Sequence, residues 1–227
     1  MLNASATLTH RLALPGHTFH VIALDGNPVP APVDIAVLEL APGERIDAIV
    51  EMSEPGVWIL GEEDATQRNA GAGIVVEYAG SKGPARWIPP APAAWRYGAF
   101  ASRDTAPEPD ARIPLVIEPG VNGNLWAING KSFPHTDPIL LRAGARNRLI
   151  LDNRGMMDHP VHTHRHSFEI ARHAGQAMNG LLKDVVIVPA RQVVEVDVLA
   201  NNSGPSLLHC HQQFHMDFGF MAVMQYA

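Results

Sequence analysis

The stretch Gly16-His17-Thr18-Phe19-His20-Val21-Ile22 recurs at a constant offset of 149 as Arg165-His166-Ser167-Phe168-Glu169-Ile170-Ala171, and a glycine follows each copy at the same spacing. The correspondence continues downstream, where residues 42–45 precede one alternating segment and residues 189–192 precede another. A repeat of this length indicates two copies of one structural unit in the chain.

The composition indicates that each copy is built from strands. Apolar residues alternate with polar ones from Arg45 to Met52 and from Val194 to Val198, which is the period of a half-buried strand. No segment shows a helical period longer than one or two turns. Glycine and proline, 19 residues each, punctuate short segments, and 46% hydrophobic content is enough for two cores. We therefore expect an all-β chain with two Greek-key β-sandwich domains.

A proline-rich stretch over residues 80–112 separates the copies. Proline resists both helix and central strand, so this stretch is expected to be a linker. Trp87, Trp95 and Tyr97 interrupt its polarity, and we expect them to pack the linker against one or both domains rather than to meet a substrate. The domains would then span residues 1–79 and 113–227.

The second copy carries two histidine-rich motifs that the first copy lacks. One is the triplet His209-Cys210-His211 with a further histidine at His215, and the other runs from His159 through His162 to His164. One thiolate with imidazoles is the donor set of a trigonal, electron-transfer copper. Because side chains alternate along a strand, Cys210 should face one side while its two neighbouring histidines face the other.

Applied to both motifs, this alternation predicts two metal stations joined by the backbone of Cys210. The first station would comprise His159, Cys210 and His215. The second would comprise the four remaining histidines of the motifs, His162, His164, His209 and His211. Zinc also accepts His and Cys, but structural zinc sites close a single tetrahedron, whereas these donors are divided between two faces. The sequence therefore favours copper.

Comparison with the first copy distinguishes metal-ligand histidines of the second copy from histidines that belong to the shared fold. At the same offset, His162 and His164 fall on Ala13 and Pro15, and the His-Cys-His triplet falls near residues 60–62, so no copper site is expected there. His166 matches His17 in the copy without ligands, and we interpret it as structural. Isolated histidines are interpreted as ordinary (His10) or as surface residues (His20, His135 and His173).

The paired motifs resemble the third domain of the multicopper oxidases, the laccase and copper-resistance oxidase family. The resemblance implies cupredoxin domains, a type 1 copper held by His159, Cys210 and His215, a type 2 ligand in His162, and type 3 ligands in His164, His209 and His211. It implies a catalytic role for Cys210, His209 and His211, which would pass electrons from a reducing substrate to a trinuclear copper cluster that reduces O2 to water.

Two positions bear on how closely the chain follows that family. The axial position, ten residues after the cysteine, is Phe220, whose phenyl ring cannot coordinate; this implies a three-coordinate, relatively high-potential copper. Met221 is the alternative if a bulge brings its sulfur round. Arg165 stands where relatives commonly have glycine.

The resemblance also implies that the chain is incomplete. It begins within the second domain, so the first sandwich would lack its N-terminal strands, and the cluster would need four more histidines from a missing N-terminal cupredoxin domain. We therefore expect the C-terminal part of a copper-dependent oxidoreductase whose parent is periplasmic or extracellular, although this chain shows no export signal. The alternative is a stand-alone type 1 copper-binding or electron-transfer protein without oxidase activity; a purely structural relative is disfavoured because all seven ligand positions are intact.

Other partners are constrained only loosely. A formal net charge of −6 gives no nucleic-acid signal, and no apolar run suggests a membrane. Phenols or aromatic amines are the substrates that the resemblance implies first, and metal ions second. No methionine-rich insert is present, and five methionines of the C-terminal copy are expected in core packing (Met156, Met157, Met216, Met221 and Met224).

Overall fold

The computed structural model describes residues 1–102, 104–120 and 125–227, and nearly all of its regular structure is strand. In the N-terminal part the elements are β1 (His10–Ala13), β2 (Phe19–Leu24), β3 (Asn27–Ile35), β4 (Val37–Leu40), β5 (Ile46–Val50), β6 (Val57–Glu62), α1 (Ala65–Asn69), β7 (Gly73–Glu77) and the 3-10 turn Tyr97–Ala99. In the C-terminal part they are β8 (Ala111–Pro119), β9 (Trp126–Ile128), β10 (Ile139–Leu141), β11 (Arg146–Asn153), β12 (His159–Thr163), β13 (Phe168–His173), β14 (Gln176–Ala177), β15 (Leu182–Lys183), β16 (Val185–Val188), β17 (Val193–Leu199), β18 (Ser206–Cys210), α2 (Gln213–Asp217) and β19 (Met221–Tyr226).

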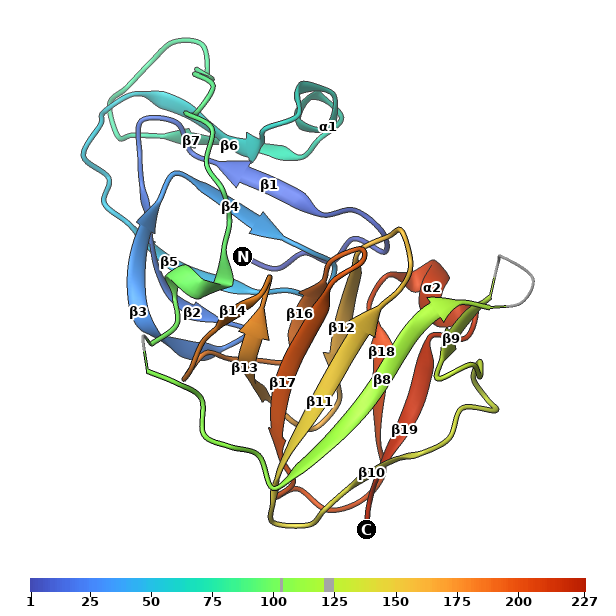
Figure 1. Cartoon of the computed structure of the whole chain (residues 1–227). Coiled ribbons are helices and arrows are strands. Elements are labelled where there is room, and N and C mark those ends of the chain that lie inside the picture. Colours follow the sequence, from blue (N-terminus) through green and yellow to red (C-terminus); the bar gives the residue numbers. More distant parts are fainter. Residues whose placement is uncertain (103, 121–124) are drawn as a thin grey trace.

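The strands form two sandwiches that lie against each other (Figure 1). The first pairs the sheet β4-β1-β6-β7 with the sheet β3-β2-β5. The second pairs β10-β19-β18-β12-β16 with a larger sheet of order β14-β13-β17-β11-β8-β9. The all-β, cupredoxin-like class is confirmed. Among the described residues the first sandwich has no strand that matches β8, β9, β10 or the body of β11.

The internal repeat is confirmed down to single hydrogen bonds. The ring of His17 donates from Nδ1 to the carbonyl of Pro15 at 3.1 Å, and its Nε2 accepts from the hydroxyl of Tyr78 at 2.6 Å. The ring of His166 makes the same two bonds, to the His164 carbonyl at 3.2 Å and the Tyr226 hydroxyl at 2.8 Å. The structural role expected for His166 is therefore confirmed.

Both cores are filled from the repeated strands. Phe19 and Phe168 stand at the matching position of the two copies and are 2% and 1% exposed. Burial of one large apolar side chain stabilises a fold by about 1.5–3 kcal/mol, so these positions hold the two sheets of each sandwich together. One detail of the predicted pattern is wrong: Met52 lies beyond the end of β5 and is 47% exposed.

Arg165 occupies a backbone conformation that normally favours glycine. Its φ is +63°, and its counterpart Gly16 has a φ of +79°. A side chain in this left-handed region costs about 1–2 kcal/mol. The guanidinium donates to the side-chain oxygen of Asn202 at 2.9 Å and to the carbonyl of Ser203 at 2.8 Å, which offsets part of that cost.

The three aromatic residues of the proline-rich stretch pack as expected. Tyr97 is 2% exposed; its hydroxyl donates to the Glu44 carboxylate of the first sandwich and accepts from the Ile187 N–H of the second. Trp95 packs on Phe100 and against the buried apolar core, and the guanidinium of Arg68 from the first sandwich lies over Trp87. Strand β8 begins at Ala111, within the stretch predicted as linker. Among the described residues no helix has the length and apolarity needed to span a bilayer.

Candidate metal centre

Two neighbouring strands of the second sandwich carry the histidine motifs. β12 and β18 pair antiparallel, with Val161 opposite Cys210 and His162 opposite His209. This register places Cys210 on one face of the sheet and the His162–His209 pair on the other. The short helix α2 follows, where the side chain of Gln212 caps the helix by accepting from the His215 N–H at 3.0 Å.

The first predicted station is assembled in the core. His159 Nδ1 lies 3.7 Å from Cys210 Sγ, His215 Nδ1 lies 3.5 Å from the same sulfur, and the two nitrogens are 3.0 Å apart. An ion bound trigonally, with bonds of about 2.0 Å to nitrogen and 2.3 Å to sulfur, would separate nitrogen and sulfur by about 3.7 Å. The donor set therefore fits one ion, with a narrower angle between the imidazoles.

Burial sets the protonation states of this station. The side chains of His159, Cys210 and His215 are 0%, 0% and 1% exposed. Burial, reinforced by the neighbouring His215, lowers the pKa of His159 to about 3, and burial lowers the pKa of His215 to about 4. Burial raises the pKa of Cys210 to about 12. Both rings are neutral at pH 7 and ready to coordinate, whereas the thiol must lose its proton to solvent when a cation binds the sulfur.

Two aromatic side chains enclose the station. The ring of Trp126 lies 4.6 Å from that of His159 and 4.3 Å from that of His215, and sequence reasoning did not identify it as a site residue. The fully buried Phe220 ring lies 5.0 Å from the His159 ring. Met221 pairs with His209 across β18 and β19, and so belongs to the opposite face from Cys210. The aromatic contacts exclude water from the donors.

The second predicted station lies behind the same strand. His162, His164 and His209 each offer a nitrogen within 4.8 Å of the others, and the Nε2 atoms of His164 and His209 are 2.9 Å apart. His211 stands beside this group, with its ring 5.6 Å from that of His162 and 5.8 Å from that of His209. The structure therefore brings three of the four predicted donors together and places the fourth next to them.

Backbone carbonyls orient two of these rings. His162 donates from Nδ1 to the carbonyl of Asp184 at 2.8 Å, and His209 donates from Nδ1 to the carbonyl of Cys210 at 2.9 Å. Each bond leaves Nε2 free to face the station. Burial lowers the pKa of His209 to about 4, and burial with neighbouring histidines lowers the pKa of His164. Burial therefore favours the neutral, coordinating form of His164 and His209.

Residues of the first sandwich also contact the second station. Sequence reasoning did not predict these contacts. The guanidinium of Arg45 donates two hydrogen bonds of 2.6 Å to the carboxylate of Asp184. Burial disfavours ionisation of this carboxyl, but the hydrogen bonds from Arg45, together with the nearby His162 ring, outweigh it and hold the pKa of Asp184 well below its usual range. Gly43 lies directly against the ring of His211. No local sequence signal marks these contacts, because the partners are far apart in the chain.

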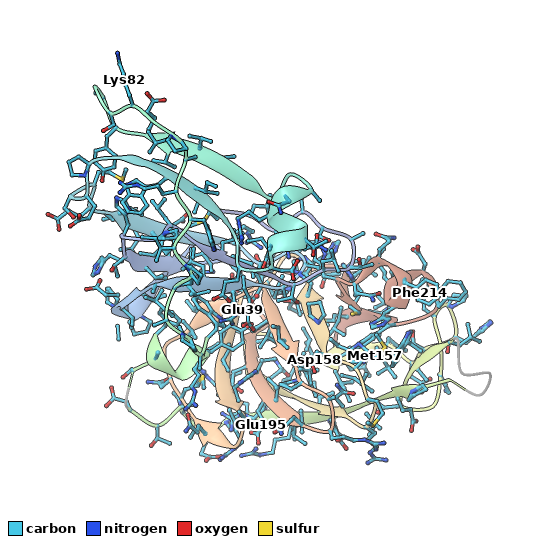
Figure 2. All side chains as sticks on the ribbon, turned by 90° about the horizontal axis from the view of Figure 1, so that it is seen from above. Glu39, Lys82, Met157, Asp158, Glu195 and Phe214 are labelled. Carbon is cyan, nitrogen blue, oxygen red and sulfur yellow. The ribbon has the colours of Figure 1, made fainter. Side chains whose placement is uncertain are left out.

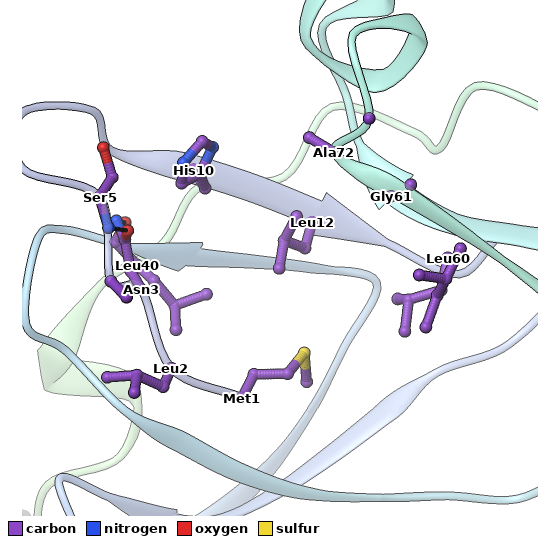
Figure 3. Close-up of a pocket in the computed structure, with 14 residues that line it drawn as sticks. Met1, Leu2, Asn3, Ser5, His10, Leu12, Leu40, Leu60, Gly61 and Ala72 are labelled. Carbon is purple, nitrogen blue, oxygen red and sulfur yellow. Dashed lines mark hydrogen bonds between the residues drawn. The ribbon is translucent and has the colours of Figure 1, made fainter.

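The first sandwich carries a different pair at the position of the first station. Leu12 pairs with Glu62 as Val161 pairs with Cys210, so Glu62 stands where the cysteine does. His10, the counterpart of His159, bonds Glu62 Oε2 through Nδ1 at 2.8 Å. A pocket of about 510 Å³ lies beside it, lined largely by apolar residues such as Leu12 and Leu60 (Figure 3). The ordinary role expected for His10 is consistent with this bond.

The remaining expectations for histidine and methionine are partly wrong. His20 and His135 are exposed, as expected. His173 is half-buried, packs edge-on against Tyr97 and bonds the Ile187 carbonyl at 2.9 Å, so it is not a surface residue. Met224 is buried, but Met156 is 74% exposed and Met157 47% exposed, because both lie in the loop before β12 rather than on a core-facing strand.

This loop borders a cleft between the sandwiches. Figure 2 shows Met157 and Asp158 on the side of the molecule that also carries Phe214, which is 52% exposed. The cleft has a volume of about 380 Å³, and its lining includes Met157, Asp158 and Gln212 from the second sandwich and Thr9 and Glu39 from the first. Its lining therefore includes the residues that directly precede His159 and the residue that directly follows His211.

Comparison with known proteins identifies relatives over the whole chain. Family models described as multicopper oxidase match residues 106–227 and residues 1–81. The multicopper oxidase MmcO of Mycobacterium tuberculosis is 32% identical over 233 residues, which cover 100% of this chain and 45% of that protein. A copper resistance protein A homologue of Pseudomonas syringae pv. tomato is 32% identical over 122 residues, covering 52% of this chain and 20% of that protein.

Solved structures show the same architecture. A laccase from Botrytis aclada superimposes with a TM-score of 0.77 at 19% identity, covering 98% of this chain and 50% of the laccase. A multicopper oxidase from Campylobacter jejuni, described as a metallo-oxidase, superimposes with a TM-score of 0.74 at 18% identity, covering 99% of this chain and 52% of that protein. The chain spans about half the length of these relatives.

Proposed function

The chain belongs to the multicopper oxidase family, and on that premise we propose that it forms the C-terminal part of a copper-dependent oxidase. This oxidase passes electrons from a reducing substrate through a type 1 copper to a trinuclear copper cluster, where O2 is reduced to water. The observation that carries the proposal is the division of donors between the two faces of β18, with a buried thiol on one face and a group of imidazoles on the other.

Each donor has a role in this proposal. His159, Cys210 and His215 hold the type 1 copper. His162 is the type 2 ligand, and the type 3 ligands are His164, His209 and His211. Copper supplies one-electron chemistry by cycling between Cu(I) and Cu(II). Cys210 and its peptide links to the adjacent histidines give a covalent path between the two stations.

The surroundings of the first station support a high reduction potential. Phe220 presents a ring, not a donor atom, to the side of His159, and Met221 lies on the other face of the sheet. A copper held by His159, Cys210 and His215 alone would favour the reduced ion, because Cu(I) accepts low coordination numbers. We propose that Phe220, rather than Met221, borders this copper and adds no further donor.

The second station needs a partner to complete the cluster. The resemblance assigns four further histidines to an N-terminal cupredoxin domain, and the chain spans about half the length of its relatives. The other partners are O2 and a small reducing substrate, either a phenol, an aromatic amine or a metal ion. Relatives named laccase and copper resistance protein A support a periplasmic or extracellular parent. These family relationships do not favour the stand-alone alternative.

We also retain the predicted domain division as part of the proposal. Residues 1–79 form the copper-free domain and residues 113–227 the copper-binding domain, with the proline-rich stretch between them. The Tyr97 hydroxyl makes hydrogen bonds to both sandwiches, which supports a linker that is packed against the two domains.

The test is to load the chain with copper and record absorbance and O2 uptake. A thiolate-bound Cu(II) should absorb at about 600 nm. Cys210→Ser should abolish this band, whereas His164→Ala should leave it. Oxygen uptake should require the N-terminal domain of a relative, supplied with this chain. A blue band that survives Cys210→Ser, or bound copper without any blue band, would refute the proposed type 1 site.

A further inference from the structure

We propose that Arg45 and Asp184 are positioning residues for the second station, through which the copper-free sandwich fixes the tautomer and direction of His162. The inference rests on the proposed role of His162 as a copper ligand. It assigns a task to the first sandwich, which has no metal station of its own among the described residues.

The first step is the bond that orients the ring. His162 Nδ1 donates to the carbonyl of Asp184 at 2.8 Å, and the nearer carboxylate oxygen of Asp184 is 3.6 Å from the same nitrogen. A ring held as the Nδ1–H tautomer presents an Nε2 lone pair to the station. If this bond loosened, the ring could carry its proton on Nε2, which could not then coordinate.

The second step is what holds the Asp184 peptide in place. Arg45 grips the Asp184 carboxylate with two parallel bonds of 2.6 Å, a geometry that fixes direction as well as distance. From the other side, the Asp25 carboxylate accepts from the Asp184 N–H at 3.2 Å and from the Val185 N–H at 3.1 Å. Side chain and peptide of Asp184 are thus both held by the first sandwich.

A buried cation anchors the arrangement. Lys183, 1% exposed, places Nζ 2.8 Å from Asp25 and 3.2 Å from Glu44, whose carboxylate also accepts from Tyr97. A buried ammonium is costly unless it is paired with carboxylates, so these ion pairs disfavour packings of the two sandwiches that would separate Lys183 from Asp25 and Glu44. The polar contacts run without a break from the linker to the His162 ring.

The internal repeat supplies an independent argument. Ala13 pairs with Val37 as His162 pairs with Val185, so Ala13 is the counterpart of His162 and Ala36 that of Asp184. Where the histidine is missing, the carboxylate is missing too. The scaffold itself therefore does not require an acid at this position, and its presence accompanies the ligand.

The test reads the tautomer of His162 in the metal-free protein by two-bond proton–nitrogen NMR correlation. The unmodified chain should show Nδ1–H alone, and Arg45→Ala should show a mixture of both tautomers. Arg45→Lys should restore part of the preference for the Nδ1–H tautomer, because an ammonium supplies the positive charge but not the two parallel hydrogen bonds of a guanidinium. Asp184→Asn keeps the accepting carbonyl and removes the charge; it serves as the second variant if Arg45→Ala does not fold.

Arg11→Ala is the matched control. The side chain of Arg11 is 32% exposed, against 33% for Arg45, and it also bonds carboxylates, those of Glu39 and Glu63. It makes no contact with a station histidine in the described structure. The control should leave the His162 tautomer unchanged, which separates a positioning effect from the general loss of an ion pair.

A second measurement follows Cu(II) binding in a Cys210→Ser background, where the first station lacks its thiolate donor. Loss of an outer partner typically weakens metal affinity by about 10- to 100-fold, and we expect that range for Arg45→Ala. Unchanged tautomer populations in both Arg45→Ala and Asp184→Asn would overturn the inference. If the background variant binds no Cu(II), the proposed second station fails instead, and the tautomer comparison still decides the positioning role.

Discussion

Gly43→Ala should damage the second station while leaving the first intact. A methyl group on Gly43 would lie 2.6 Å from Nε2 and 2.7 Å from Cγ of the His211 ring. Ordinary contacts of this kind begin at 3.4 Å, so the ring must retreat by about 1 Å. Functional groups must be held within about 0.5 Å of their working positions, so the shift exceeds what the station tolerates.

The backbone contributes a second, separable effect. The φ of Gly43 is +83°, and a side chain in this region costs about 1–2 kcal/mol. Gly80→Ala is the matched control, because the φ of Gly80 is +81° and no atom lies within 4 Å of the added methyl group. In urea denaturation Gly80→Ala should lose only this backbone term and Gly43→Ala at least as much, and only Gly43→Ala should disturb His211.

The assay is Cu(II) titration in the Cys210→Ser background, with the blue absorbance of the otherwise unmodified variants as the record of the first station. We expect affinity at the second station to fall at least about tenfold for Gly43→Ala and to be unchanged for Gly80→Ala. Equal affinities in the two variants would refute the reasoning, because they would show that His211 does not depend on the space that Gly43 leaves.

Three further predictions concern the rest of the molecule. The metal-free protein should lose stability as the pH falls below about 6.5. Burial lowers the pKa of His159 to about 3 and of His209 to about 4, so in this range the unfolded chain binds protons that the folded chain does not bind. A free energy of unfolding that stays constant between pH 7 and pH 5 would contradict this. Phe220→Met should lower the reduction potential of the blue copper in a redox titration, whereas Met221→Leu should not change it. Arg165→Ala should be less stable than Arg165→Gly by about 1–2 kcal/mol in thermal denaturation, since both lose the guanidinium bonds and only alanine keeps the strained φ.

The sequence predicted those parts of the site that depend on alternation along one strand. Cys210 and His209 lie on opposite faces because consecutive strand residues must do so, and the His17–His166 match identified a structural histidine because both copies needed it. The division of the fold into two sandwiches followed from the same repeat. These inferences needed only local geometry and comparison within the chain.

The contacts between sandwiches could not be predicted in this way. Arg45 and Asp184 are 139 positions apart, and Trp126 reaches the first station from β9. No periodicity relates such residues, because they meet only when the two sandwiches pack or when separate sheets close over one core. Likewise, Met157 resembled a core residue by type, but its exposure depends on the loop that carries it.

The hydrogen bond between His10 and Glu62 has a consequence for how the protein acquires its metal. The two copies share one sandwich architecture with a sulfur donor at this position in one and a carboxylate in the other, so the architecture does not depend on which side chain stands there. Folding can therefore precede metallation. We expect a chelator to remove copper from the protein reversibly. The metal-free protein should keep its fold and bind copper again.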